Sequence, residues 1–138
     1  MLKMDREALT AFLTRDFPQV CDDFAIDRAE ADGLTVRLRV AERHLRPGGT
    51  VSGPSMFALA DVAVYLAILA RLGPVALAVT TSASLDFMRK PAPGIDIRCD
   101  ARLLKLGRLL AVGDCLLRSV DGDAPVARAT LTYAIPPR

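Results

Sequence analysis

The sequence predicts an α+β fold in which one long apolar helix is wrapped by a curved antiparallel sheet of about six strands. The helix is indicated by residues 54–70, where Asp61 is the only charged residue. Strand-like runs lie on both sides of it, two before and four after. A helix that is apolar nearly all round must be covered on most sides, and a curved sheet can cover it. The 138 residues, 51% of them hydrophobic, suffice for one core. We therefore expect a single domain over residues 1–138.

The residue pattern of the N-terminal part of the chain predicts a short helix followed by a β-hairpin. Residues from about 4 to 15 carry apolar side chains at positions i, i+3 and i+4, and Pro18 marks the end of this helix. Residues 24–31 and 34–40 flank the Asp-Gly pair at 32–33, which is a strong signal for a two-residue turn. Apolar and polar residues alternate in the second run, so these antiparallel strands each have one face toward solvent.

The central helix is preceded by a loop and followed by four strands. Residues 41–53 hold Pro47 and three glycines, which predicts a loop. Pro54 suits the first helical position, and Gly73-Pro74 ends the helix after Leu72. The remaining strand-like runs are residues 75–88, 95–106, 108–120 and 125–135, with a hairpin at 121–123 between the last two. An open sheet leaves edge strands that commonly pair across a two-fold axis, so we expect at least a homodimer, with a homotetramer as the larger alternative.

Composition excludes several classes of protein. The 18 basic and 16 acidic residues are spread along the chain and form no basic stripe of the kind that binds nucleic acid. Cys21, Cys99 and Cys115 lack CxxC spacing, so we expect neither disulfides nor a metal site, and no cofactor. Charges at residues 5–7 interrupt any secretory signal, and the apolar stretch falls short of the roughly 20 residues that span a bilayer. A cytoplasmic protein without membrane or nucleic-acid partners is expected.

Asp61 is the best candidate for chemistry. Burying an unpaired carboxylate costs several kcal/mol, so a core helix that carries one needs compensation. One interpretation is structural, with Asp61 paired to an arginine or facing solvent on a partly exposed stripe. The functional interpretation places the carboxylate in a dry cleft, as a general base on water or as a nucleophile toward a carbonyl carbon.

Gly53 is a candidate carbonyl-binding group at the start of the same helix. Backbone N–H groups at a helix N-terminus favour a developing negative charge, although Gly and Ser at this place also serve simply as caps. Gly53 and Asp61 are eight residues apart, or about 12 Å of helix rise. One carboxylate side chain cannot close that gap onto a carbonyl held at Gly53, so if both groups serve one substrate we expect each site to combine Gly53 of one subunit with Asp61 of another.

Other polar residues offer weaker signals. His44 is the only histidine and no serine lies in a GxSxG elbow, so a Ser-His-Asp triad has poor support. Arg89, Lys90 and Arg108 lie near predicted strand ends, where solvated charge is the ordinary interpretation. The same side chains could hold the phosphates of a nucleotide-bearing substrate.

The segment HLRPGGTVSGPSMFALADVAVYLA, residues 44–67, resembles the helix-entry signature of hotdog-fold acyl-CoA thioesterases of the phenylacetate-pathway and human acyl-CoA thioesterase type. The closing strands are similar as well. The resemblance implies a hotdog fold, with Asp61 as base or nucleophile and the Gly53 N–H as carbonyl polariser. It also implies a water-orienting hydroxyl on the strand after the helix; Thr80, Thr81 and Ser82 qualify, and we choose Thr81.

Three departures from that family affect the region of the binding residues. The family's His before the first Gly is Ser52 here, its second Gly is Pro54, and its upstream Asn falls at or near Arg46. A lost orienting donor typically costs about 2.7–4 kcal/mol in the transition state. The expected function is hydrolysis of an acyl-CoA thioester to a carboxylic acid and free CoA, the alternative being a non-hydrolytic acyl-CoA or small-ligand binding protein. The expected substrate-binding residues are Arg46, Ser52, Phe57, Tyr65, Arg89, Lys90 and Arg108.

Overall fold

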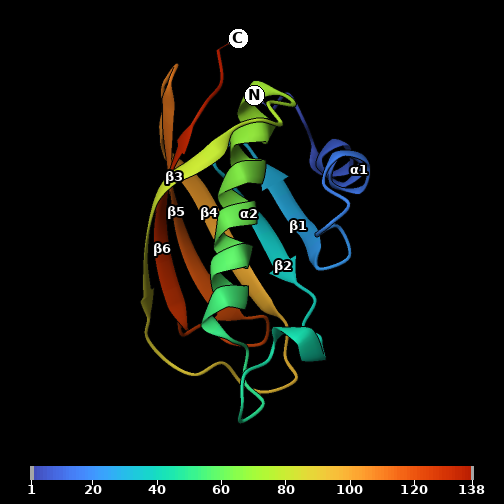
Figure 1. Ribbon diagram of the computed structural model, residues 1–138, viewed down its shortest axis with the longest axis vertical. Helices are drawn as coiled ribbons and strands as arrows, with labels where there is room; N and C mark the ends of the chain where they lie inside the picture. Colours follow the sequence, from blue (N-terminus) through green and yellow to red (C-terminus); the bar gives the residue numbers. More distant parts are fainter. Residues whose placement is uncertain (1, 138) are drawn as a thin grey trace.

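The computed structural model describes residues 2–137 and contains two α-helices, one 3₁₀ turn and six strands (Figure 1). The helices are α1 (Arg6–Asp16) and α2 (Gly53–Leu72), with the 3₁₀ turn η1 (Glu42–His44) between them. The strands are β1 (Phe24–Glu30), β2 (Gly33–Leu38), β3 (Val79–Phe87), β4 (Ile97–Leu106), β5 (Leu110–Ser119) and β6 (Ala127–Ala134).

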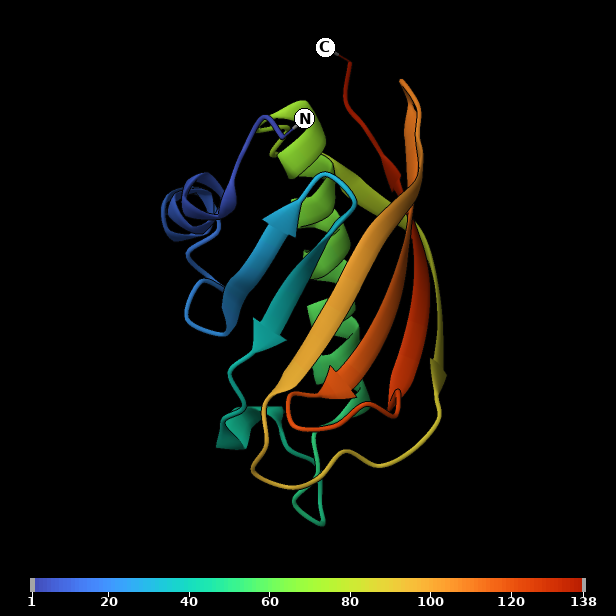
Figure 2. The same cartoon turned by 180° about the vertical axis from the view of Figure 1, so that it is seen from behind.

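All six strands form one antiparallel sheet in the order β1-β2-β4-β5-β6-β3. Figure 1 shows α2 lying along the concave face of this sheet, and Figure 2 shows the opposite face from behind. Inward-facing positions alternate along the inner strands, as in β6, where every second residue is buried against α2. The α+β hotdog fold expected from the sequence is confirmed.

Small residues let α2 approach the sheet closely. Gly113 of β5 faces Val64 of α2, and a Cβ built on Gly113 would lie only 2.7 Å from a Val64 methyl carbon. Among the described residues, α2 is long and apolar enough to cross a bilayer by length and composition, yet 67% of that stretch is buried inside the fold. The helix is the core of the domain, and its partly open stripe at Asp61 is therefore the exception that needs explaining.

The strands and helices begin and end within two residues of the expected positions, except at the start of β3. The strand predicted from residue 75 begins at Val79, because the preceding residues form turns in which Val75 donates to Gly73 and Ala78 donates to Val75. The link between β5 and β6 covers residues 120–126, longer than the expected hairpin at 121–123. The turn before β3 matters for function because it lines the cleft described below.

The two edges of the sheet are unlike each other. The β1 edge carries charged residues and lies beside α1. The β3 edge is exposed along most of its length, with Val79, Phe87 and the adjacent Met88 at 58%, 53% and 47% exposure. As an end strand, β3 presents unpaired backbone N–H and C=O groups to which another strand could bind.

Candidate functional site

Asp61 is half-buried on α2 and is held by two hydroxyl groups. Thr80 of β3 donates to Asp61 Oδ1 at 2.5 Å, and Tyr133 of β6 donates to the same oxygen at 2.8 Å. The Tyr133 hydroxyl also lies 2.8 Å from the Asp61 main-chain oxygen. Both donors serve one carboxylate oxygen, which fixes the orientation of the group and directs the other oxygen elsewhere.

Tyr133 reaches Asp61 because it occupies an inward position on β6. It is buried, and burial together with the nearby Asp61 charge raises the pKa of its phenol well above the ordinary value. The hydroxyl therefore remains protonated at physiological pH and continues to donate to the carboxylate. Thr80 stands opposite Tyr133 in the pairing of β3 with β6, so the two donors approach from adjacent strands.

Asp61 opens into a cleft of about 480 Å³, here called the Asp61 cleft. Its volume falls within the range typical of small-molecule sites. The walls come from the end of α1, from α2, from the turn before β3 and from β6. The lining residues are Asp16, Phe17, Gln19, Asp61, Val62, Tyr65, Ala76, Leu77, Ala78, Val79, Thr80 and Tyr133.

Within residues 2–137 no basic side chain lies at ion-pair distance from Asp61. The interpretation of Asp61 as the partner of an arginine thus lacks a partner in the described chain. Its charge is compensated by hydroxyl dipoles and by access to the cleft, an arrangement that leaves a carboxylate available for acid–base or nucleophilic chemistry.

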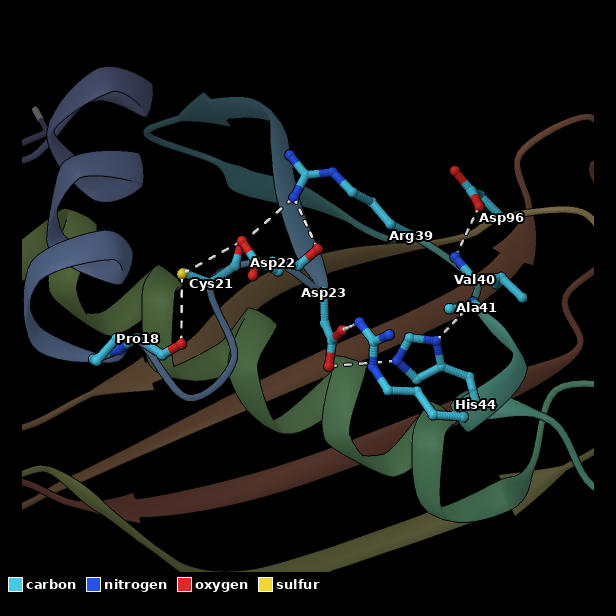
Figure 3. Close-up of polar contacts among 10 residues, drawn as sticks. Pro18, Cys21, Asp22, Asp23, Arg39, Val40, Ala41, His44 and Asp96 are labelled. Carbon is cyan, nitrogen blue, oxygen red and sulfur yellow. Dashed lines mark hydrogen bonds and ion pairs between the residues drawn. The ribbon is translucent and has the colours of Figure 1, made fainter.

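The loop before α2 is anchored by His44, whose contacts with Ala41 and Asp23 are drawn in Figure 3. The Ala41 N–H donates to His44 Nδ1 at 2.9 Å, and His44 Nε2 lies 3.4 Å from Asp23 Oδ2 without full hydrogen-bond geometry. The His44 carbonyl in turn accepts from the Ser52 N–H at 2.8 Å. His44, expected in a loop, is therefore a buried anchor that positions Ser52.

Ser52 is the N-cap of α2, and its hydroxyl accepts from the Ser55 N–H at 3.2 Å. Gly53 begins the helix behind this cap. A second cleft, of about 400 Å³ and here called the Gly53 cleft, opens beside it. Its walls are Arg46, Thr50, Val51, Gly53, Met56, Phe87, Met88, Arg89, Lys90 and Pro91.

The two clefts of one chain share no lining residue among those described. Asp61 therefore lies at one opening, whereas Gly53 and the basic residues lie at another, about 12 Å along α2 by helix rise. Phe87, at the end of β3, lies against Gly53, with 3.4 Å between its ring and a Cβ built there. Strand β3 thus runs from the Asp61 cleft at Thr80 to the Gly53 cleft at Phe87.

Comparison with known proteins agrees with this geometry. The profile of the thioesterase superfamily matches residues 48–126, more than half of the chain. This chain belongs to the thioesterase superfamily. A candidate esterase of Pseudomonas aeruginosa is 33% identical over 103 residues, which make up 75% of each protein.

Two solved structures extend the likeness of this thioesterase-superfamily chain. A candidate thioesterase from Silicibacter sp. TM1040 is 63% identical, with a TM-score of 0.93 over 99% of this chain and 95% of that one. A variant of the phenylacetic acid degradation protein PaaI of Thermus thermophilus is 27% identical, with a TM-score of 0.74 over 86% of this chain and 99% of that one. The resemblance drawn from the sequence is confirmed at the level of family and fold.

The structure distinguishes the three hydroxyl residues considered on the strand after the helix by their contact with Asp61, and the water-orienting role assigned to Thr81 stays a prediction. Thr80, not Thr81, is the threonine that contacts Asp61. The register of β3 against β6 shifts between Thr80 and Ser82, so Thr81 is the extra residue of a bulge. Its hydroxyl donates to the Thr132 carbonyl at 3.3 Å and is exposed. Because a bulge changes which side chains face inward, the sequence alone could not tell which of the three residues contacts Asp61.

Some of the other expected site residues line a cleft and some do not. Tyr65 lines the Asp61 cleft and donates to the Ala76 carbonyl at 2.9 Å. Phe57 is 37% exposed on the open stripe of α2 and lines neither cleft. Arg108 lies at the exposed tip of the β4–β5 hairpin, apart from both. Their roles in substrate binding remain predictions.

Three wall residues of the Asp61 cleft were not singled out by sequence. Tyr133 lies 72 positions after Asp61, and only the pairing of β6 with β3 brings it close. Phe17 and Asp16 come from the end of α1, where the aromatic residue just before Pro18 was the one available signal. Within the described residues no group of three His, Cys, Asp or Glu side chains gathers in a way that could hold a metal ion.

Proposed function

We propose that this protein is an acyl-CoA thioesterase in which Asp61 acts as general base or nucleophile. The observation that carries the proposal is a carboxylate without an ion-pair partner, oriented by the hydroxyls of Thr80 and Tyr133, at the wall of a cleft that is mostly apolar. Membership of the thioesterase superfamily supports the same reaction class. The acyl group would occupy the Asp61 cleft, with the thioester carbonyl near the carboxylate.

Hydrolysis replaces the C–S bond of the thioester by a C–O bond. As base, Asp61 takes a proton from water while the water oxygen attacks the carbonyl carbon; as nucleophile, it attacks that carbon itself and water later cleaves the acyl-enzyme anhydride. In both routes negative charge develops on the carbonyl oxygen, and the CoA sulfur departs as thiolate and is protonated. A backbone N–H directed at that oxygen is the group the reaction needs.

Gly53 would supply that N–H from a second subunit. Two β3 edges that pair antiparallel across a two-fold axis near Ala83, the middle residue of the strand, would set Thr80 of one chain opposite residue 86 of the other. Because Phe87 lies against Gly53, the partner subunit's Gly53 would then approach Asp61. This supports a composite site at a dimer interface and gives the exposed apolar edge of β3 a covering strand.

The same symmetry would bring the partner's basic residues toward the mouth of the Asp61 cleft. Arg46, Arg89 and Lys90 share the Gly53 cleft, and no acidic residue lines it within the described chain. Phosphates of CoA would be met by these side chains, whereas Asp16 and Asp61 at the other cleft would repel them. The charge distribution thus supports acyl-CoA as the substrate and orients it, acyl group toward Asp61 and nucleotide toward the basic cleft.

The alternative, a protein that binds acyl-CoA without cleaving it, is favoured by the entry to α2. The Ser52 hydroxyl is engaged in capping the helix, at the position where related thioesterases carry His, and Pro54 replaces a second Gly. A thioesterase assay distinguishes the two functions. The parent is expected to release CoA from short-chain, medium-chain or aryl thioesters, whereas Asp61→Asn loses at least about 100-fold in kcat/KM.

The control experiment measures the thermal stability and the oligomeric state of Asp61→Asn. The Asn side chain can still accept from Thr80 and Tyr133, so Asp61→Asn should melt within a few degrees of the parent and keep its oligomeric state. Binding of acyl-CoA without turnover by the parent would establish the alternative instead. A stable monomer in light scattering at micromolar concentration would reject the composite site.

A further inference from the structure

A run of aromatic rings leads away from Asp61 along one wall of its cleft. The rings of Tyr133 and Tyr65 are 6.1 Å apart, and those of Tyr65 and Phe17 are 5.9 Å apart in an edge-to-face arrangement. Placed end to end, these separations reach at most about 12 Å from the Asp61 end to the end of α1. Such a wall suits an extended acyl chain or a short aryl group.

Two polar side chains lie at the far end of this wall. Asp16 closes α1, and Gln19 follows three residues later; both line the cleft. Both side chains are also open to solvent. Arg15 donates to Asp16 Oδ2 at 3.0 and 3.1 Å, so Oδ1 is the oxygen of Asp16 that is left for a ligand. Burial and, after it, the Asp16 charge raise the pKa of Tyr65, which places that charge close to the aromatic wall.

The polarity of the cleft decides which part of a substrate reaches this end. A carboxylate lies at each end, and no described residue of the lining is basic; Arg15, which pairs with Asp16 at 3.0 Å, lies outside the lining. The phosphates of CoA are therefore disfavoured here, and the terminus of the acyl group remains as the part that meets Asp16. An alkyl terminus would desolvate the carboxylate without giving it a partner, whereas a hydroxyl would donate to Oδ1 and accept from the Gln19 amide.

We propose that Asp16 and Gln19 form a subsite that selects acyl groups bearing a hydroxyl, or another hydrogen-bond donor, at the end remote from the thioester. This subsite rests on the proposed function, since it presupposes that the acyl group lies in the Asp61 cleft. Residues 16–19 lie outside the segment 48–126 that matches the superfamily profile. Selectivity would thus reside in a part of the chain separate from the superfamily core.

Three eight-carbon thioesters test the subsite, because they differ only at the chain terminus: octanoyl-CoA, 8-hydroxyoctanoyl-CoA and the CoA monothioester of octanedioic acid. The parent is expected to favour the hydroxylated chain over octanoyl-CoA by roughly 3- to 10-fold in kcat/KM, the range of one net hydrogen bond. The dicarboxylic monothioester should be the poorest of the three, because its terminal carboxylate is repelled by Asp16.

Variants of Asp16 should reverse these preferences. In Asp16→Leu the ratio of kcat/KM for 8-hydroxyoctanoyl-CoA to that for octanoyl-CoA should fall to about 1. This variant should hydrolyse octanoyl-CoA at least as fast as the parent does. Asp16→Asn removes the repelling charge and should raise kcat/KM for the dicarboxylic monothioester at least about fivefold. Glu7→Leu, which removes an exposed carboxylate of α1 that does not line the cleft, is the matched control and should leave all three rates unchanged.

Failure of the subsite is distinguishable from failure of hydrolysis. A parent that prefers octanoyl-CoA, or an Asp16→Leu variant that keeps the parent's hydroxyl preference, overturns the subsite while the thioesterase stands. If turnover is absent, calorimetry can measure the affinity of Asp61→Asn for each of the three thioesters. A higher affinity for the hydroxylated thioester than for octanoyl-CoA would support the subsite even though no hydrolysis occurs. Absence of binding by all three overturns both proposals.

Discussion

Replacing Tyr133 by Phe removes one oxygen atom from the site and should separate the positioning of Asp61 from its chemistry. The Tyr133 hydroxyl donates to Asp61 Oδ1 at 2.8 Å and touches the Asp61 carbonyl oxygen at the same distance. Thr80 alone would then hold the carboxylate, through its 2.5 Å hydrogen bond. Because one donor leaves rotation about the remaining contact possible, the carboxylate should lose its fixed orientation.

The magnitude follows from the kind of bond that is lost. A hydrogen bond to a charged group contributes about 1.5–3 kcal/mol, and partial solvent access at Asp61 reduces this to about 1–2 kcal/mol. For a domain of this size, the melting temperature should fall by about 3–8 °C. A misplacement of the reacting carboxylate on the order of 1 Å should lower kcat by about 10- to 100-fold, with KM changing little.

The assay combines a thermal melt with steady-state release of CoA thiol. Thr35→Val is the control, because it removes a hydroxyl–carboxylate hydrogen bond of 2.6 Å to Asp100 on the outer face of the sheet. It should cost comparable stability and leave kcat at the parent value. A Tyr133→Phe variant with lowered melting temperature but kcat within about twofold of the parent would show that Tyr133 only supports the fold, and the reasoning about orientation would be refuted.

Gly113→Ala should destabilise the fold by about 1–3 kcal/mol, since its Cβ would lie 2.7 Å from a methyl carbon of the fully buried Val64; chemical denaturation measures the change. Asp23→Asn should lose less stability than the parent does when the solution is acidified. Burial raises the pKa of Asp23, but the hydrogen bond from Arg43 and the close approach of His44 outweigh it and lower the pKa below 3.8. That stabilisation is complete above the ordinary pKa and disappears as the pH falls through the lowered one, which melts between about pH 5 and pH 2.5 should detect. Affinity for free CoA should decrease as the salt concentration rises. At low salt it should also be lower in the triple Ala variant of Arg46, Arg89 and Lys90, which line the Gly53 cleft, than in the parent.

Matched controls make these outcomes decisive. Gly122→Ala adds a methyl group in the β5–β6 link with 4.0 Å to the nearest atom, so it should change stability by less than about 0.5 kcal/mol. Asp22→Asn removes a neighbouring exposed carboxyl and should leave the acid limb of the stability curve as in the parent. Equal CoA affinity of the triple variant and the parent at low salt would exclude those three residues from phosphate binding.

Local patterns in the sequence were sufficient for the elements and for one catalytic candidate. The alternation in residues 34–40, the Asp-Gly turn and the apolar run around Asp61 each report burial over a few neighbouring positions. Burial periodicity is a local property, because side chains alternate every two residues in a strand and every 3.6 in a helix. A lone acid on a core helix stands out against that background, so Asp61 could be identified without a structure.

The partners of Asp61 and the shape of its cleft were decided by tertiary structure alone. The bulge between Thr80 and Ser82 is set by how β3 pairs with β6, and it determines that Thr80 rather than Thr81 faces the carboxylate. Tyr133 arrives from a strand far along the chain. Contacts between distant segments depend on register, and a shift of one residue turns every side chain to the opposite face. For that reason the sequence by itself determined which residue of the helix is chemically unusual, while the folded sheet decided which hydroxyls orient it, that Gly53 opens into a separate cleft, and that the end of α1 closes the far wall.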